Sequence, residues 1–109
     1  MSACIKRNMT LLRLLHKSKP SLVKAILKNA PSDLVRALCE CSLNVLKGNI
    51  KLNASQKTRL RRYKNILRKL ATKKVTAKTR KQMLQKGGFI GALLGPVLGV
   101  LGSLLNGTR

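Results

Sequence analysis

The chain contains very few acidic and aromatic residues. Its 109 residues include two acids, Asp33 and Glu40, one histidine, His16, and two aromatics, Tyr63 and Phe89. A catalytic acid–base pair or a metal site needs several such groups close together, and no spacing in the sequence brings these together. We therefore expect no enzymatic activity, no cofactor and no metal ion. Because Tyr63 is the one aromatic of the basic part, binding of single strands by base stacking is also disfavoured.

The three cysteines, Cys4, Cys39 and Cys41, do not indicate a disulfide framework, because their number is odd. Cys39 and Cys41 lie two positions apart on a predicted helix, where their side chains would point about 200° apart. They are therefore not expected to hold one metal ion together. We interpret all three as structural thiols of a protein from a reducing compartment.

Positive charge is what the chain has in excess. Twenty-four lysines and arginines give a formal net charge of +22, and fourteen of them lie between residues 51 and 86. A monomeric fold gains nothing from this self-repulsion, which indicates a polyanionic partner. Nucleic acid is the first candidate and an anionic membrane the second. Neutralisation of phosphates releases counterions, so such binding would be independent of base sequence and strongly dependent on salt.

Alanine, leucine and lysine dominate the composition and favour helices over strands. The expected fold is all-α, with four to five short helices in a basic domain and a C-terminal hydrophobic, glycine-rich helix. Residues 1–8 are expected to be a frayed basic start. The predicted helices of the basic part span residues 9–17, 22–29, 33–47, 54–72 and 77–86.

Several residues are typical of helix ends. Ser32 is predicted to cap the helix at 33–47. Asn53 followed by Gln56 resembles a capping box, and Thr76 is predicted to cap the last basic helix. Gly87 is expected to end that helix as its C′ glycine.

The helix predicted at 54–72 contains no acid. An ordinary solvated helical face would mix glutamate with lysine, so this pattern favours phosphate contact. A helix-turn-helix spanning residues 33–70 is an alternative, although no recognised DNA-binding motif surrounds its amide side chains. The residues predicted to contact DNA phosphates are Lys57, Arg59, Arg61, Arg62, Lys64, Arg68, Lys69, Lys73, Lys74, Lys78, Arg80 and Lys81.

The C-terminal segment 89–105 carries no charge. As a helix it would be about 25 Å long, slightly short for a hydrocarbon core of about 30 Å. Gly91, Gly95 and Gly99 recur every four residues, a spacing that lets helices approach closely, and Pro96 is expected to kink the helix. A buried core helix, a membrane-active segment, and a self-association or capsid-docking segment remain open alternatives.

The junction between the two parts reads KGGFIGALLGPVLGV over residues 86–100. It resembles the precursor of the adenovirus minor core protein known as pX or mu. That family has an arginine-rich DNA-condensing part, a basic-Gly-Gly junction and a hydrophobic Gly/Pro-containing tail. The longer body here also looks like proteins of adenovirus-related elements, the adintoviruses and Polintons.

The resemblance implies a viral minor core protein precursor that condenses packaged double-stranded DNA, in the virion core and in the host nucleus during assembly. In that family the viral maturation protease cuts after the diglycine. The resemblance implies a cut between Gly88 and Phe89, directly after the pair Gly87 and Gly88. The family prefers a large aliphatic residue four positions before the cut, where this chain has Gln85.

The sequence thus predicts two parts. Residues 1–86 form a basic helical body that binds nucleic acid, and residues 87–109 form a diglycine junction and a hydrophobic tail that contacts membrane or capsid proteins. The alternative function is a membrane-active or membrane-anchored virion protein, whose basic body binds anionic lipid while the tail inserts.

Overall fold

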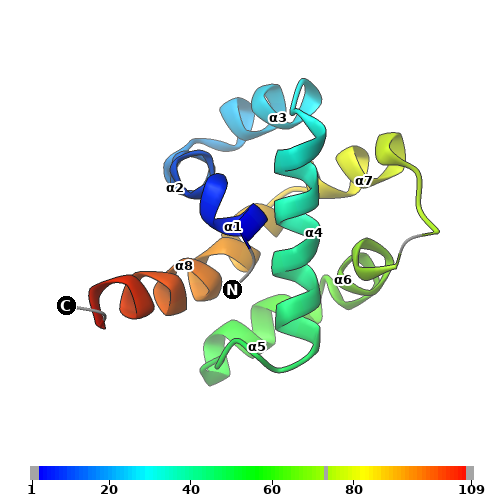
Figure 1. The fold of residues 1–109 in the computed structure, drawn as a ribbon. Helices are drawn as coiled ribbons and strands as arrows, with labels where there is room; N and C mark the ends of the chain where they lie inside the picture. Colours follow the sequence, from blue (N-terminus) through cyan, green and yellow to red (C-terminus); the bar gives the residue numbers. More distant parts are fainter. Residues whose placement is uncertain (1–2, 73, 108–109) are drawn as a thin grey trace.

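The computed structural model describes residues 3–72 and 74–107, and this part of the chain contains helices and no strand (Figure 1). The expected all-α fold is confirmed. The helices are α1 (Ala3–Arg7), α2 (Met9–Lys17), α3 (Pro20–Lys28), α4 (Ser32–Leu46), α5 (Ala54–Arg61), α6 (Lys64–Ala71), α7 (Ala77–Leu84) and α8 (Phe89–Gly107).

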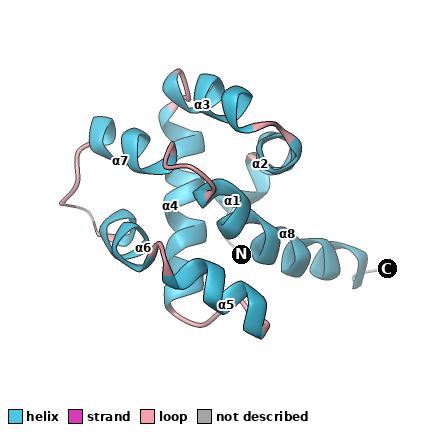
Figure 2. Ribbon diagram, turned by 180° about the vertical axis from the view of Figure 1, so that it is seen from behind, coloured by secondary structure: helices cyan, strands magenta, loops and turns pink. Residues whose placement is uncertain are grey.

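Helix α4 is the centre of the fold. It packs against α1, α6, α7 and α8, which surround it in both views of the molecule (Figures 1 and 2). The sequence predicts an apolar stripe at three- and four-residue steps along this helix, and its members Leu34, Ala37, Leu38, Cys41 and Val45 are buried. Leu46, which is expected to extend the stripe, is exposed. Gly48, with φ +78°, then ends the helix in a conformation that glycine adopts readily.

The first half of α8 completes the core. Phe89, Leu93, Leu94 and Val97 are fully buried, in the same cluster as the apolar residues of α2, α4 and α5. The helix continues through Pro96 and then projects from the body toward the C-terminus (Figure 1). Of the alternatives for the apolar segment, burial in the core therefore applies to residues 89–97. The sequence changes from basic to apolar after residue 86, but the hydrophobic core continues across this point into α8.

The expectation of a frayed start is wrong for residues 3–8, and residues 1–2 lie outside the described residues. Residues 3–7 form α1, in which Ile5 is fully buried and Cys4 nearly so. The Asn8 side-chain amide donates to the Cys4 carbonyl (2.8 Å) and to Asp33 Oδ2 (2.9 Å), and Arg7 Nη2 lies 3.0 Å from Asp33 Oδ1. Asp33 thus fastens α1 to the first turn of α4 across 25 residues of chain.

The helix expected at 54–72 is two helices. The helix is interrupted at Arg62 and Tyr63. Helix α5 packs on α8 and helix α6 packs on α4. The interruption allows both Leu60 in α5 and Leu67 in α6 to be buried. The Tyr63 hydroxyl donates to the carbonyl of Gly87 (2.8 Å). Local propensity predicts a continuous helix here, and the contacts of α5, α6 and Tyr63 with distant parts of the chain account for its interruption.

The predicted caps are only partly correct. The capping box is confirmed, because the backbone N–H of Gln56 donates to Asn53 Oδ1 (2.8 Å) and the backbone N–H of Asn53 donates to Gln56 Oε1 (3.0 Å). Thr76 accepts from the Thr79 amide as expected. Ser32 is not the N-cap of α4: it is the first helical residue, and Pro31 precedes it with no side-chain cap. At the end of α7, the glycine with positive φ (+81°) is Gly88 and not Gly87.

The Asp33 anchor leads to a prediction about acid stability. The hydrogen bond from Arg7, followed by that from Asn8, lowers the pKa of Asp33 from 3.8 to about 2. Because the pKa is lower in the folded state, the stabilisation is complete above pH 3.8 and is lost as the pH falls toward 2. We expect the melting temperature to drop across this range in the native chain and much less in Asp33→Asn, as measured by circular dichroism. Equal acid dependence in both proteins would contradict the assignment.

Candidate nucleic-acid interface

The predicted phosphate contacts lie on α5, α6, α7 and the segments that join them. Arg80 and Lys81, on α7, are half-buried, and Lys73 lies outside the described residues. The exposed members of the set are Lys57, Arg59, Arg61, Arg62, Lys64, Arg68, Lys69, Lys74 and Lys78. These side chains are free to reach a phosphate backbone without rearrangement of the fold.

These cations do not form one line. A methyl group added at Gly91 would lie 3.7 Å from Nη2 of Arg59, so the Arg59 guanidinium lies over the start of α8. A groove between α6 and α7 is lined by Lys69 and Lys86, by the polar side chains of Asn65, Thr79 and Gln82, and by the apolar side chains of Ile66 and Met83. Lysines and neutral hydrogen-bonding groups together are what a phosphate-binding groove requires.

The structure also exposes cations that the prediction left out. They are Lys6, Arg7, Arg13, Lys17, Lys19, Lys24, Lys28, Arg36, Lys47, Lys51 and Lys86. Each of α1 to α7 therefore carries at least one exposed lysine or arginine. The high total charge was the signal that could have identified them, whereas the choice of twelve residues depended on their density along the sequence.

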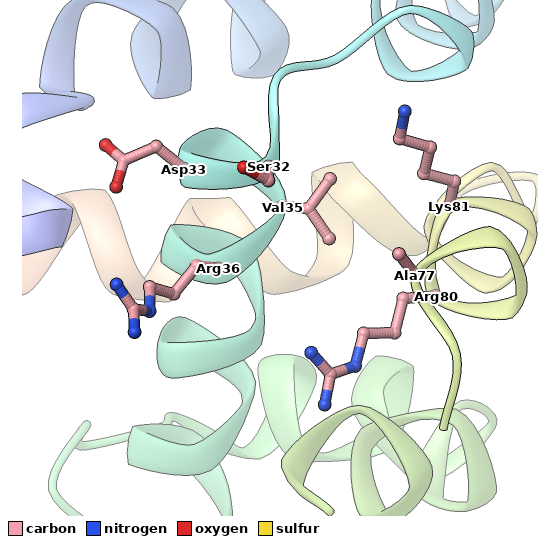
Figure 3. A pocket seen from close by; sticks show the side chains of 7 residues that line it. All are labelled: Ser32, Asp33, Val35, Arg36, Ala77, Arg80 and Lys81. Atoms are coloured by element: carbon pink, nitrogen blue, oxygen red, sulfur yellow. The ribbon is translucent and has the colours of Figure 1, made fainter. Parts of the chain in front are cut away.

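Two acids can offset at most two of the twenty-four positive charges. Asp33 bonds with Arg7 and Asn8, and Glu40 on α4 is half-buried. Figure 3 shows the Asp33 carboxylate directed away from Arg80 and Lys81. The positive charge of the exposed side chains is thus left available for a polyanion.

A second hollow lies between the first turns of α4 and helix α7, with a volume of about 470 Å³ (Figure 3). It is lined by Ser32 and Arg36 from α4 and by Arg80 and Lys81 from α7. The sequence does not predict this grouping, because 44 residues separate Arg36 from Arg80 and only the packing of α7 against α4 brings them to one hollow.

The diglycine junction is held in place by the fold. Gly87 and Gly88 are exposed, but the next residue, Phe89, is fully buried as the first residue of α8. The Tyr63 ring meets the Phe89 ring edge to face, with centroids 5.4 Å apart. A protease that needs an extended chain across Gly88 and Phe89 would therefore have to unwind the first turn of α8.

The predicted stripe of small residues is divided between two environments. Gly91 lies next to Arg59, and a methyl group at Gly95 would lie 3.9 Å from Cε1 of His16 on α2. Gly99 is exposed and has open space around it. The first two glycines thus accommodate side chains of this same chain.

Within the described residues no single helix is both long and apolar enough to cross a membrane. Helix α7 and the Phe89–Val100 part of α8 meet the two conditions only together, and they form an angle of 88°.

The three cysteines are free thiols and are buried. Burial raises the pKa of Cys41 to about 12 and also raises the pKa of Cys39 and of Cys4. The thiols are therefore protonated at neutral pH. Cys39 and Cys41 serve as small apolar side chains in the core, whereas the Cys4 thiol also donates to the carbonyl (3.4 Å) and to Oδ1 (3.5 Å) of Asp33. Among the residues that the structure describes, no three histidine, cysteine or acidic side chains are placed to hold a metal ion.

Comparison of the chain with protein-family models, with curated proteins and with solved structures gives no match.

Proposed function

We propose that this protein binds double-stranded DNA without sequence preference and condenses it, as a viral minor core protein. The observation that carries the proposal is the distribution of charge. Exposed lysines and arginines occur on every helix from α1 to α7, while Asp33, one of the two acids, is engaged with Arg7 and Asn8. Such a surface attracts phosphate from many directions and selects no base sequence.

The geometry supports condensation in addition to binding. The molecule, α8 included, measures 39 × 28 × 27 Å, and Figures 1 and 2 place α3 and α5 at opposite ends of α4. Lys24 and Lys28 are exposed on α3, and Lys57 and Arg61 on α5. One protein molecule therefore presents cations to two duplexes at once, and such bridges between duplexes compact DNA.

The resemblance of residues 86–100 to the adenovirus core protein precursor supports a place in the virion core, and in the host nucleus during assembly. Processing by a viral protease between Gly88 and Phe89 is part of the proposal. Because Phe89 is buried, we expect cleavage to require local opening of the start of α8.

A salt series with the full chain tests DNA binding. Affinity for two duplexes of equal length and unrelated sequence would be measured by fluorescence anisotropy between 50 and 200 mM salt. If about 6–10 phosphates are neutralised, we expect affinity to fall by about 10³- to 10⁵-fold over this range, equally for both duplexes. A shallow slope, or a clear preference for one duplex, would contradict non-specific phosphate neutralisation.

The second candidate is a membrane-active virion protein, and one observation favours it. The end of α8 projects from the body, and no charged residue lies between Lys86 and Arg109. The test is release of dye from anionic vesicles by the full chain and by a chain shortened to residues 1–97, which keeps the buried part of α8. Release that depends on residues 98–109 would support this candidate, and equal release by both chains would contradict it.

A further inference from the structure

The hollow between α4 and α7 gathers positive charge from two helices. Arg80 and Lys81 come from α7, and Arg36 comes from α4, although Figure 3 shows its guanidinium directed away from α7. Asp33 also contributes to the lining, but its carboxylate is bonded to Arg7 (3.0 Å) and to Asn8 (2.9 Å), on the side away from α7. The hollow therefore has two cations on α7, Arg80 and Lys81, whose charge Asp33 does not neutralise. Glu40 lines an adjacent hollow together with Arg36 and Arg80.

The start of α4 lines the hollow and adds a second attraction for anions. Ser32 is the first residue of α4, a helix of 15 residues, and Pro31 before it supplies no side-chain cap. The backbone N–H groups of the first turn of a helix carry a partial positive charge and bind anionic oxygens well. The Ser32 hydroxyl lies at the same position and is a further donor.

Arg80 is held in a way that leaves it ready for an anion. Its Nη2 donates to the carbonyl of Thr72 (2.9 Å), which fixes the guanidinium between α4 and α6. Its Nε is buried and has no hydrogen-bond partner in the described chain. A buried donor without an acceptor is unfavourable, and native proteins contain few of them. A small shift of Arg80 toward an anion in the hollow would give this donor an acceptor.

We propose that the α4–α7 hollow is a phosphate-binding site that takes one phosphate of the DNA backbone. Lys81 and Arg80 supply charge-assisted hydrogen bonds, and the N-terminus of α4 supplies backbone donors. A volume of about 470 Å³ holds a phosphate with its adjoining sugar. This inference rests on the proposed function, and it adds that one contact among many is built into the fold and fixes how the duplex lies on α7.

The test compares two lysines of the same helix. Lys81 lines the hollow, whereas Lys78, three residues earlier on α7, is exposed and does not. Lys81→Gln and Lys78→Gln remove the same charge, so non-specific neutralisation predicts equal losses. At 100 mM salt we expect about a tenfold loss of duplex affinity for Lys81→Gln, and at most about a threefold loss for Lys78→Gln. Circular dichroism of both variants verifies that the fold is retained.

A spectroscopic measurement locates the anion independently of affinity. The backbone amide resonances of Ser32 and Asp33 in ¹⁵N-labelled protein should shift when duplex is added to the native chain, and should shift much less in Lys81→Gln. If the native chain binds duplex but the two variants lose affinity equally and these resonances do not respond differently, the hollow is not a site, while the proposed function stands.

If instead the native chain does not bind duplex, the proposed function fails and inorganic phosphate becomes the probe. Saturable shifts of the Ser32 and Asp33 amides that are absent in Lys81→Gln would establish a site for free phosphate and overturn its assignment to the DNA backbone. Absence of such shifts would overturn the site altogether.

Discussion

Replacement of Phe89 with alanine is expected to destabilise the protein by about 3–5 kcal/mol. The ring is fully buried at the start of α8, and its edge-to-face contact with Tyr63 is lost together with the buried area. Small domains are stable by only about 5–15 kcal/mol, so this single change removes a large part of the stability. Urea denaturation followed by circular dichroism measures it.

The matched control is Leu14→Ala on α2, whose side chain is 47% exposed. We expect this variant to lie within about 0.5 kcal/mol of the native chain in the same denaturation series. A cost below 1 kcal/mol for Phe89→Ala would mean that the segment after the diglycine is a detachable tail. For the same reason, a fragment of residues 1–88 is expected not to fold, and DNA binding must be measured on the full chain.

Removal of charge from one end of the body is expected to separate condensation from binding. The first variant replaces four exposed lysines around α3 with glutamine, namely Lys17, Lys19, Lys24 and Lys28. It keeps every predicted contact on α5 to α7, so it should still bind a single duplex. Bridging needs both ends, and loss of the second attachment removes avidity of about 10²- to 10⁴-fold. We expect at least about tenfold more protein to be needed for condensation, as measured by light scattering.

The control removes the same number of charges from the other end, at Lys57, Arg61, Lys64 and Arg68. This second variant should bind a single duplex more weakly, and should likewise condense DNA poorly. If the first variant condenses DNA as well as the native chain, bridging between the two ends is not the mechanism, and charge neutralisation along one duplex is sufficient.

Local signals made part of the fold predictable. The apolar stripe of α4 and the capping box of Asn53 and Gln56 depend on residues within a few positions of each other, and both are confirmed. One local prediction, Ser32 as the N-cap of α4, is wrong, and the larger errors occur where distant residues decide. Helix α1 is fixed by Asp33, and the break between α5 and α6 is accompanied by the contact of Tyr63 with Gly87, 24 residues later.

The sequence predicted that the candidate site would consist of lysines and arginines, but it did not predict which of them lie together. An excess of lysine and arginine in the sequence indicates a polyanionic partner, but it does not show which cations share a hollow, because that depends on how α7 packs against α4. The apolar segment was ambiguous for another reason. Core helices and membrane helices have the same composition, and only the contacts of Phe89 and Leu93 identify the first half of α8 as core.

The projecting end of α8 gives the molecule a polarity. Cations cover α1 to α7, whereas residues 87–108 carry no charge. A polyanion attracts the charged side of such a body and has no attraction for the uncharged end, so the uncleaved protein is expected to bind DNA with α8 pointing outward. On a duplex coated in this way, the uncharged ends of many α8 helices would project from the surface. Coated duplexes would then be expected to associate through apolar contacts between these helix ends, although the protein itself is bound to DNA by electrostatic attraction.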